Sequence, residues 1–178
     1  MGVSATKSGA GGLMPRGSGC CASRLTHPYC RNDFLAIYLA KLEHQNQEFD
    51  SAYLYRQVKA GPGNQSPKYV LMYQRTELAV VEVPESDTGV KALVPHKVRR
   101  LLRLDWGPDG LAFDEFATRL PESALVQSKV FSSALTPSEL QQQLTEVWHK
   151  TFDPDEWSSF NFCHHFMAQI AGKTYQYK

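Results

Sequence analysis

Residues 159–172 read Ser-Phe-Asn-Phe-Cys-His-His-Phe-Met-Ala-Gln-Ile-Ala-Gly and place one cysteine, Cys163, near the start of the last predicted helix. Apolar side chains recur through this stretch at helical spacing, Asn161 is a suitable N-cap, and Gly172 is a natural stop signal. In a first turn, free backbone N–H groups and the helix dipole favour the thiolate that a nucleophile or a metal ligand requires. The alternative is that Cys163 is a small buried hydrophobe.

The composition limits the classes of protein that this chain can represent. It has 178 residues, of which 42% are hydrophobic, and this is enough for one domain with a substantial core. Its 19 lysines and arginines nearly balance its 18 aspartates and glutamates, so the global charge argues against a nucleic-acid partner. We see no apolar run long enough to cross a bilayer and no apolar core of a secretory signal. The sequence therefore predicts a cytoplasmic protein.

The cysteines do not indicate a disulfide framework or a metal site. Cys20, Cys21, Cys30 and Cys163 are few and unevenly placed, and in the cytosol they should be reduced. His27 adds an imidazole near the first three, but the second ligand pair of a zinc site is missing. No glycine-rich loop follows a strand and opens a helix. We therefore expect neither a metal nor another cofactor.

Residues 1–26 are rich in Gly, Ser and Ala and hold few large apolar side chains, which predicts a disordered N-terminal arm. The opening Met-Gly-Val-Ser-Ala-Thr fits the pattern for myristoylation of Gly2. Because one myristoyl chain anchors a protein only weakly, palmitoylation of Cys20 and Cys21 would supply a second signal. The N-terminal arm is thus expected either to anchor the protein to the cytosolic face of a membrane or to be inert.

Residues 27–178 are expected to form a single globular domain with three helices. Hydrophobic periodicity predicts the first helix from Asn32 to Leu42. Thr136 and Glu139 offer a capping box for the second helix, which should run to about Lys150. The third is the cysteine helix.

The same domain is expected to hold a small antiparallel sheet. The predicted strands are residues 51–58, 68–73, 78–83, 111–116 and 126–131. The two segments 68–73 and 78–83 should form a hairpin of central strands, joined by the polar residues Gln74 to Glu77. Strands and helices in this order predict an α+β fold with the cysteine on the C-terminal helix.

Segment 97–104 places four cations among apolar residues: Lys97, Arg99, Arg100 and Arg103. The favoured interpretation is the solvated face of a strand or helix. The alternative is a patch for anionic lipid headgroups, which would complement an acylated N-terminal arm.

The run Cys163-His164-His165-Phe166, at a helix start and downstream of the predicted hairpin, resembles the Asn-Cys-Glu-His-Phe block of the lecithin retinol acyltransferase-like proteins. This resemblance implies a permuted papain-like arrangement in which Cys163 is the nucleophile and a strand residue is the base. Tyr69 takes the position of that base, and Glu82 takes the position of the polar residue that orients it.

The departures from the family pattern affect the base most. Tyr69 stands where the family has a histidine, and a tyrosine near its normal pKa cannot accept a proton at neutral pH. His96 is the first alternative base, and His27, His44 and His149 are the others.

Three classes of function follow from these observations. The first is thiol-dependent acyl transfer or lipid hydrolysis at a cytosolic membrane surface, with cysteine peptidase or isopeptidase activity on the same fold as its enzymatic alternative. The second is a catalytically inactive pseudoenzyme that binds a lipid or a protein partner. The third is a small interaction domain of unrelated fold in which Cys163 is merely buried.

Overall fold

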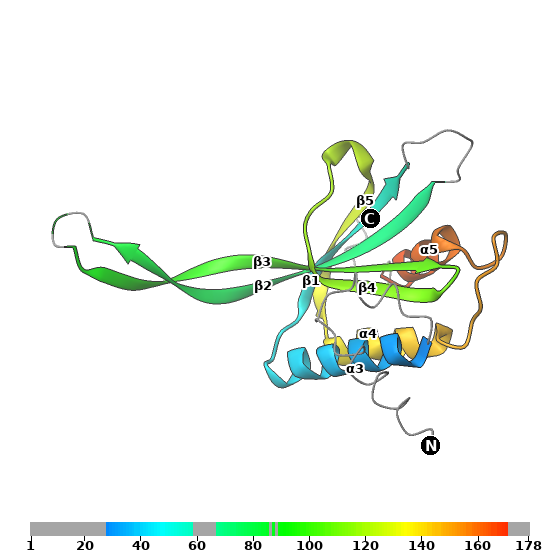
Figure 1. The fold of residues 1–178 in the computed structure, drawn as a ribbon, viewed down its shortest axis with the longest axis horizontal. Helices are drawn as coiled ribbons and strands as arrows, with labels where there is room; N and C mark the ends of the chain where they lie inside the picture. Colours follow the sequence, from blue (N-terminus) through cyan, green and yellow to red (C-terminus); the bar gives the residue numbers. More distant parts are fainter. Residues whose placement is uncertain (1–27, 59–66, 86, 88, 171–178) are drawn as a thin grey trace, which may run out of the picture.

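The computed structural model describes residues 28–58, 67–85, 87 and 89–170 (Figure 1). Its elements in chain order are α3 (Pro28–His44), β1 (Phe49–Gln57), β2 (Lys68–Pro84), β3 (Lys91–Gly107), β4 (Gly110–Ala117), the 3-10 turn η1 (Glu122–Ala124), β5 (Leu125–Leu135), α4 (Pro137–Val147) and α5 (Ser159–Ile170). The predictions for the N-terminal arm with Gly2, Cys20 and Cys21, for His27 and for Gly172 lie outside the described residues.

The strands form one five-stranded sheet in the order β4-β3-β2-β1-β5, and all neighbours are antiparallel. The predicted α+β class with an antiparallel sheet is therefore confirmed. β2 occupies the centre of the sheet, as expected for the segment that begins at Lys68.

The three helices cover one face of the sheet, and the main core lies between them and the strands (Figure 1). α3 and α4 lie side by side, while α5 packs on β2 and β3. The helices bury a stripe of apolar side chains, which includes Leu35, Leu39, Leu42, Leu140, Leu144, Val147, Phe162 and Phe166. On the opposite face, a smaller cluster of Tyr55, Val70 and Met72 packs under residues that lead into β5.

α4 begins as its sequence predicts. The Glu139 backbone N–H donates to Thr136 Oγ1 at 3.1 Å, and the Thr136 N–H donates to Glu139 Oε2 at 2.9 Å. Pro137 fits the first helical position because a first-turn N–H has no partner within the helix. The helix ends at Val147, three residues before the expected end at Lys150.

α5 begins earlier than expected, so the prediction that Asn161 is its N-cap is wrong. The first helical residue is Ser159. Asn161 instead lies inside the first turn, where its Oδ1 accepts from the Ser158 N–H at 3.0 Å and from Ser158 Oγ at 2.8 Å. Because the Phe162 N–H already donates to the Ser158 carbonyl at 3.0 Å, Cys163 lies beyond the free N–H groups of the helix start.

The predicted turn at Gln74–Glu77 is also wrong, because β2 continues through it to Pro84. The chain reverses ten residues later, where the Glu85 N–H donates to the Val90 carbonyl at 2.9 Å and Gly89 takes φ +68°. The sequence Gln-Arg-Thr-Glu contains none of the residues that favour tight turns, whereas the segment after Pro84 contains Ser, Asp and Gly.

The long strands β2 and β3 extend well beyond their neighbours. β1 pairs with β2 only as far as Phe49 opposite Arg75, and β4 pairs with β3 only as far as Ala117 opposite Leu101. Beyond these points β2 and β3 pair only with each other. Residues 76–84 and 91–100, here called the β-arm, therefore project from the body as a twisted two-stranded ribbon (Figure 1).

Candidate functional site

Cys163 lies in the main core, between α5 and the sheet. Its exposed fraction is 0%, and it belongs to the same buried cluster as Leu71, Tyr73 and Trp106. The apolar stripe of α5 that contains Phe162 also contains Cys163, because these two adjacent residues face the same broad core. A substrate in solvent cannot reach this sulfur without a rearrangement of the core.

The buried carboxylate of Asp105 contributes to the shifted pKa of the Cys163 thiol. Asp105, near the end of β3, forms ion pairs with Lys68 Nζ and Arg103 Nη2, both at 3.3 Å. Burial is the main cause that raises the pKa of Cys163 well above its usual range; the negative charge of Asp105 adds to it, and Lys68 opposes it. A nucleophilic cysteine requires a lowered pKa, so the environment of Cys163 favours the opposite protonation state.

Tyr69 is the one predicted partner that the structure brings to the helix of Cys163. Its backbone N–H donates to Ser159 Oγ at 3.0 Å. Its ring makes edge contacts with the rings of Phe160 and His164, at centroid distances of 5.2 and 5.7 Å. Tyr69 therefore helps to fix the start of α5 against β2.

The structure does not bring His96 and Glu82 to Cys163. Both lie on the β-arm, His96 opposite Ala79 and Glu82 in an exposed ion pair with Lys91 at 3.2 Å. His96 lies beyond Leu101, the last residue of β3 that pairs with β4. These two residues are therefore features of the β-arm.

The other described histidines are exposed or bond to residues other than Cys163. His44 at the end of α3 and His149 after α4 are exposed. His164 and His165 hydrogen-bond to other residues of α5. Among the described residues, the charges that shift the pKa of Cys163 come from Asp105 and Lys68 and from no imidazole.

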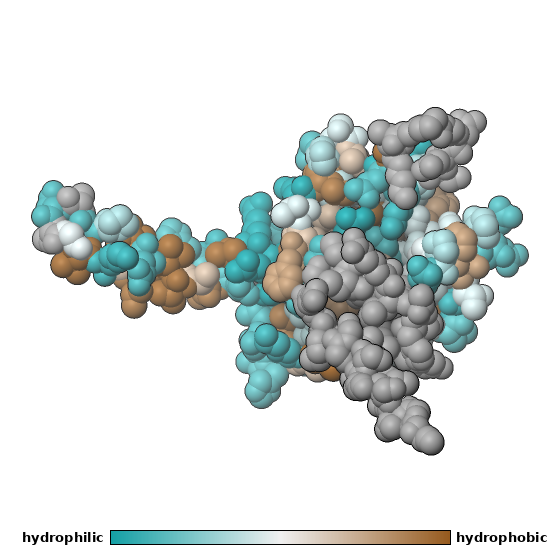
Figure 2. All heavy atoms as spheres, in the orientation of Figure 1, coloured by the Kyte–Doolittle hydropathy of each residue, from teal (hydrophilic) through white to brown (hydrophobic). Residues whose placement is uncertain are grey.

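The β-arm is the most apolar exposed element in the described part of the chain. Half of the large hydrophobic side chains that are exposed there lie on the β-arm or its turn, namely Leu78, Val80, Val81, Val83, Val90 and Leu93. Figure 2 shows brown patches, mixed with teal, along the projection. Contiguous apolar surface of this kind usually marks an interaction site.

Strand register assigns the β-arm side chains to two faces. Leu78 lies opposite Lys97, Val80 opposite Pro95 and Glu82 opposite Leu93. Because side chains alternate along a strand and cross-strand partners share a face, these residues lie on one side of the ribbon. We call this side the outer β-arm face, which consists of Thr76, Leu78, Val80, Glu82, Pro84, Lys91, Leu93, Pro95, Lys97 and Arg99.

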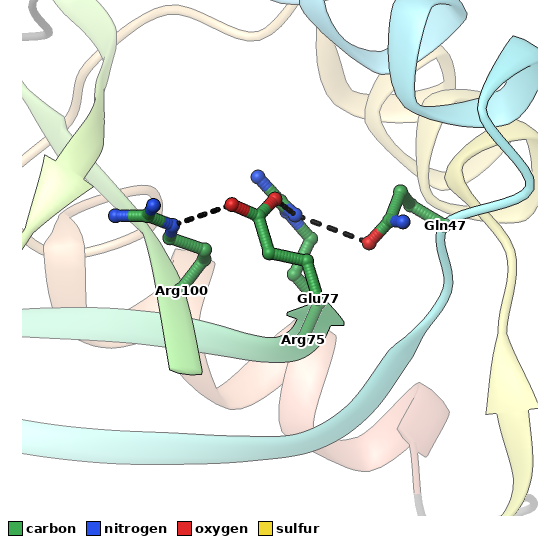
Figure 3. Close-up of polar contacts among 4 residues, drawn as sticks. All are labelled: Gln47, Arg75, Glu77 and Arg100. Carbon is green, nitrogen blue, oxygen red and sulfur yellow. Dashed lines mark hydrogen bonds and ion pairs between the residues drawn. The ribbon is translucent and has the colours of Figure 1, made fainter. Parts of the chain in front are cut away.

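A polar cluster holds the β-arm where it leaves the body (Figure 3). Arg75 Nη1 donates to Gln47 Oε1 at 3.1 Å and pairs with Glu77 Oε2 at 2.5 Å. Arg100 Nε donates to Glu77 Oε1 at 2.9 Å. Arg75 and Arg100 lie directly opposite each other, so Glu77 neutralises two cations that would otherwise repel.

The polar cluster around Glu77 should make the stability of the protein depend on pH. Hydrogen bonds from Arg75 and then Arg100 lower the pKa of Glu77 below its usual value. A lowered native pKa contributes stability above the unfolded pKa, which is lost as the pH falls through the native pKa. With solvent screening of this partly exposed carboxylate, Glu77→Gln should cost about 0.5–1 kcal/mol at neutral pH, and this difference should vanish at an acidic pH below the native pKa of Glu77. Urea unfolding of both proteins at the two pH values tests this; an equal difference at both would contradict it.

Comparison with protein-family models, curated proteins and solved structures finds no match to this chain. The fold and its sites thus define it by class alone, as an α+β protein with a buried thiol and a projecting β-arm. In the described part of the chain, no helix is both long and apolar enough to span a bilayer, and no group of three or more potential ligands is placed to hold a metal ion.

The β-arm, Arg75 and Asp105 were not identified as functional elements from the sequence. The absence of turn-forming residues at Gln74–Glu77 was the available signal for a long hairpin. Asp105 comes shortly before the turn between β3 and β4. The sequence around it therefore did not distinguish it from a turn residue.

Proposed function

We propose that this chain is a catalytically inactive binding protein that contacts a protein partner through the β-arm. The observation that carries the proposal is the row of exposed aliphatic side chains on a ribbon that extends beyond the body. An isolated two-stranded hairpin is marginally stable in water, so a partner that covers this surface would also stabilise it.

The state of the thiol supports the inactive form. Acyl transfer, lipid hydrolysis and peptide or isopeptide hydrolysis by a cysteine all need an accessible thiolate and a base. Cys163 is fully buried, and burial with the charge of Asp105 raises its pKa. Tyr69, in the position expected for the base, contacts Phe160 and His164 through its ring.

We further propose that the chain has the permuted papain-like arrangement implied by its resemblance to the lecithin retinol acyltransferase-like proteins. The support is the hydrogen bond between the Tyr69 N–H and Ser159 Oγ, which joins the strand of the expected base to the helix of the expected nucleophile. A chain that kept this packing and lost the accessible thiolate would be a pseudoenzyme. Membrane anchoring through Gly2, Cys20 and Cys21 concerns residues outside the described part of the chain.

Alkylation of Cys163 tests the inactive state directly. In the native protein at neutral pH, iodoacetamide should label Cys163 at least about 100-fold more slowly than in the urea-unfolded protein, because the thiol is buried and its pKa is raised. Peptide mass spectrometry separates Cys163 from Cys20, Cys21 and Cys30.

The unfolded protein is the control for the intrinsic reactivity of the peptide. Rapid native labelling, with an apparent pKa below the roughly 8.5 of a free cysteine, would contradict the proposal and favour the enzymatic alternatives.

A further inference from the structure

The hydrogen-bonding pattern of the β-arm directs one row of backbone groups on β2 away from β3. At the turn, the Glu85 N–H donates to the Val90 carbonyl at 2.9 Å. Because hydrogen-bonded and non-hydrogen-bonded pairs alternate in an antiparallel ladder, the odd-numbered residues of β2 bond to β3. The N–H and C=O groups of Leu78, Val80 and Glu82 therefore point to the other side, which we call the free edge of β2.

Pro95 supports this assignment independently. It lies opposite Val80 in the register, and a proline has no N–H to donate to the neighbouring strand. The Val80–Pro95 pair must therefore be a non-hydrogen-bonded pair, which agrees with the direction inferred from the turn. Among the described residues, β1 pairs with β2 no further than Arg75, so no strand of this part of the chain covers the free edge beyond it.

The two edges of the β-arm differ in how they admit a further strand. The edge of β3 presents the backbone of residues that include a proline and three cations, namely Lys91, Leu93, Pro95, Lys97 and Arg99. Proline and lysine on an edge are features that block the addition of a strand. Between Thr76 and Pro84, the free edge of β2 presents neither, and its Leu78 and Val80 are 71% and 66% exposed. The edge of β2 is therefore the open one.

We propose that an extended segment of a partner protein adds to the free edge of β2 as a further strand, beside Leu78, Val80 and Glu82. This inference rests on the proposed function and identifies the kind of partner that the β-arm binds. Donors and acceptors that recur about every 7 Å along an edge are matched by another extended backbone. A helix has already paired its own backbone groups, and the phosphates of a membrane or a nucleic acid accept hydrogen bonds but do not donate them.

The side chains of β2 define the chemistry of this segment. Leu78 and Val80 flank the free edge on the outer β-arm face, and Ala79, Val81 and Val83 flank it on the opposite face. Cross-strand neighbours on both faces would thus be apolar, which favours β-branched or aromatic side chains in the partner. We expect an uncharged core of about five residues in the added strand.

Amide hydrogen exchange of the full chain, resolved by residue with NMR, tests the free edge itself. The even-numbered amides from Leu78 to Glu82 should exchange at least about 10-fold faster than the odd-numbered amides from Ala79 to Val83, after correction for intrinsic rates. The reason is that only the odd-numbered amides donate to β3. A bound strand should slow the even-numbered amides about 10-fold or more.

A phage-displayed library of random linear peptides, of about 12 residues each, supplies the probe. Peptides selected on the full chain should share an apolar, β-prone core. Val80→Pro should weaken their binding at least about 30-fold, measured by fluorescence anisotropy, because it removes an N–H from the free edge and places a ring there. Val80→Thr is the matched control, since it keeps both the N–H and the β-branched shape, and it should change the dissociation constant less than about 3-fold.

Two measurements separate strand addition from damage to the β-arm. In Val80→Pro, the amides of Ala79 and Val81 should stay protected, because their partners on β3 are unchanged. A selected peptide can also be N-methylated at one or the other set of alternate residues, which leaves the protein itself intact. Only one set faces β2 in an added strand, so one version should lose binding and the other should keep it.

Three peptide results would overturn the proposal: no peptide is selected, selected peptides bind Val80→Pro as tightly as Val80→Thr, or both N-methylated versions bind alike. Protection of the even-numbered amides that rises with protein concentration alone would also overturn it, because a second copy would then occupy the free edge.

Leu93→Glu distinguishes a failure of this inference from a failure of the proposed function. Leu93 is 69% exposed on the outer β-arm face, but it lies on β3, away from the free edge of β2. Peptides that tolerate Val80→Pro and are lost with Leu93→Glu would keep the β-arm as the binding site and reject strand addition. Peptides that are indifferent to both substitutions would reject the β-arm as the binding site, and Cys163 labelling tests the inactive state separately.

Discussion

Phe162→Ala should lower the free energy of unfolding by about 3–5 kcal/mol. Phe162 is fully buried at the centre of an aromatic cluster, where its ring centroid lies 5.6 Å from Trp106, 6.2 Å from Trp157 and 4.8 Å from Phe166. Truncation would remove the transfer free energy of the ring and leave a cavity lined by rigid indoles. Because a domain of this size is stable by only about 5–15 kcal/mol, the variant should be close to unfolding.

Phe160→Ala is the matched control for this substitution. Phe160 lies two residues earlier in α5 and is 46% exposed, with its ring against Tyr69 and His164. Its truncation should cost about 1 kcal/mol or less, since water already reaches the ring. Urea unfolding followed by circular dichroism measures both values. Equal losses would mean that α5 does not pack on the sheet through Phe162.

The helices could be predicted because their signals are local. The capping box of Thr136 and Glu139 depends on residues within one turn, and it forms as expected. The stripe that leads to Leu39 and Leu42 in α3 likewise follows from a single helical period. Such elements need no information from distant parts of the chain.

The β-arm could not be placed by local signals alone. Its length is set by where β1 and β4 stop pairing with β2 and β3, and this depends on contacts between segments far apart in the sequence. The polar residues Gln74–Glu77 mark the point where β2 leaves the body, not a turn. In this segment Arg75 is buried and Thr76 is exposed, so the polar residues marked the hydrogen-bonded base of the β-arm and not a loop.

The chemistry of Cys163 depends on its depth in the fold. Phe162, Cys163, Phe166, Met167 and Ile170 are all buried, so the cysteine belongs to one broad apolar stripe of α5. In the sequence these residues fall at positions 162–163, 166–167 and 170, which is helical spacing. This pattern favours a buried Cys163 over an accessible one. The raised pKa could not be predicted in this way, because Asp105 comes to the thiol only through strand pairing and helix packing.

Arg75→Ala should lower the free energy of unfolding by about 3 kcal/mol. Arg75 is 8% exposed and is held by Gln47 from the α3–β1 connection and by Glu77 from its own strand. Tyr38 of α3 also interacts with the Arg75 guanidinium. Its loss would leave partly buried polar partners without their hydrogen bonds and open a gap beneath α3.

The same substitution should loosen the β-arm, because Arg75 lies at the last residue of β2 that pairs with β1. Amide hydrogen exchange in residues 76–84 should rise about 10-fold or more, with exchange in α4 changing only through global stability. Arg99→Ala is the control, since Arg99 lies on the exposed face opposite Thr76, and it should cost less than about 0.5 kcal/mol. If Arg75→Ala left both the unfolding free energy and the β-arm exchange unchanged, the direction of the β-arm would be set by backbone pairing alone, and the cluster at its base would be dispensable.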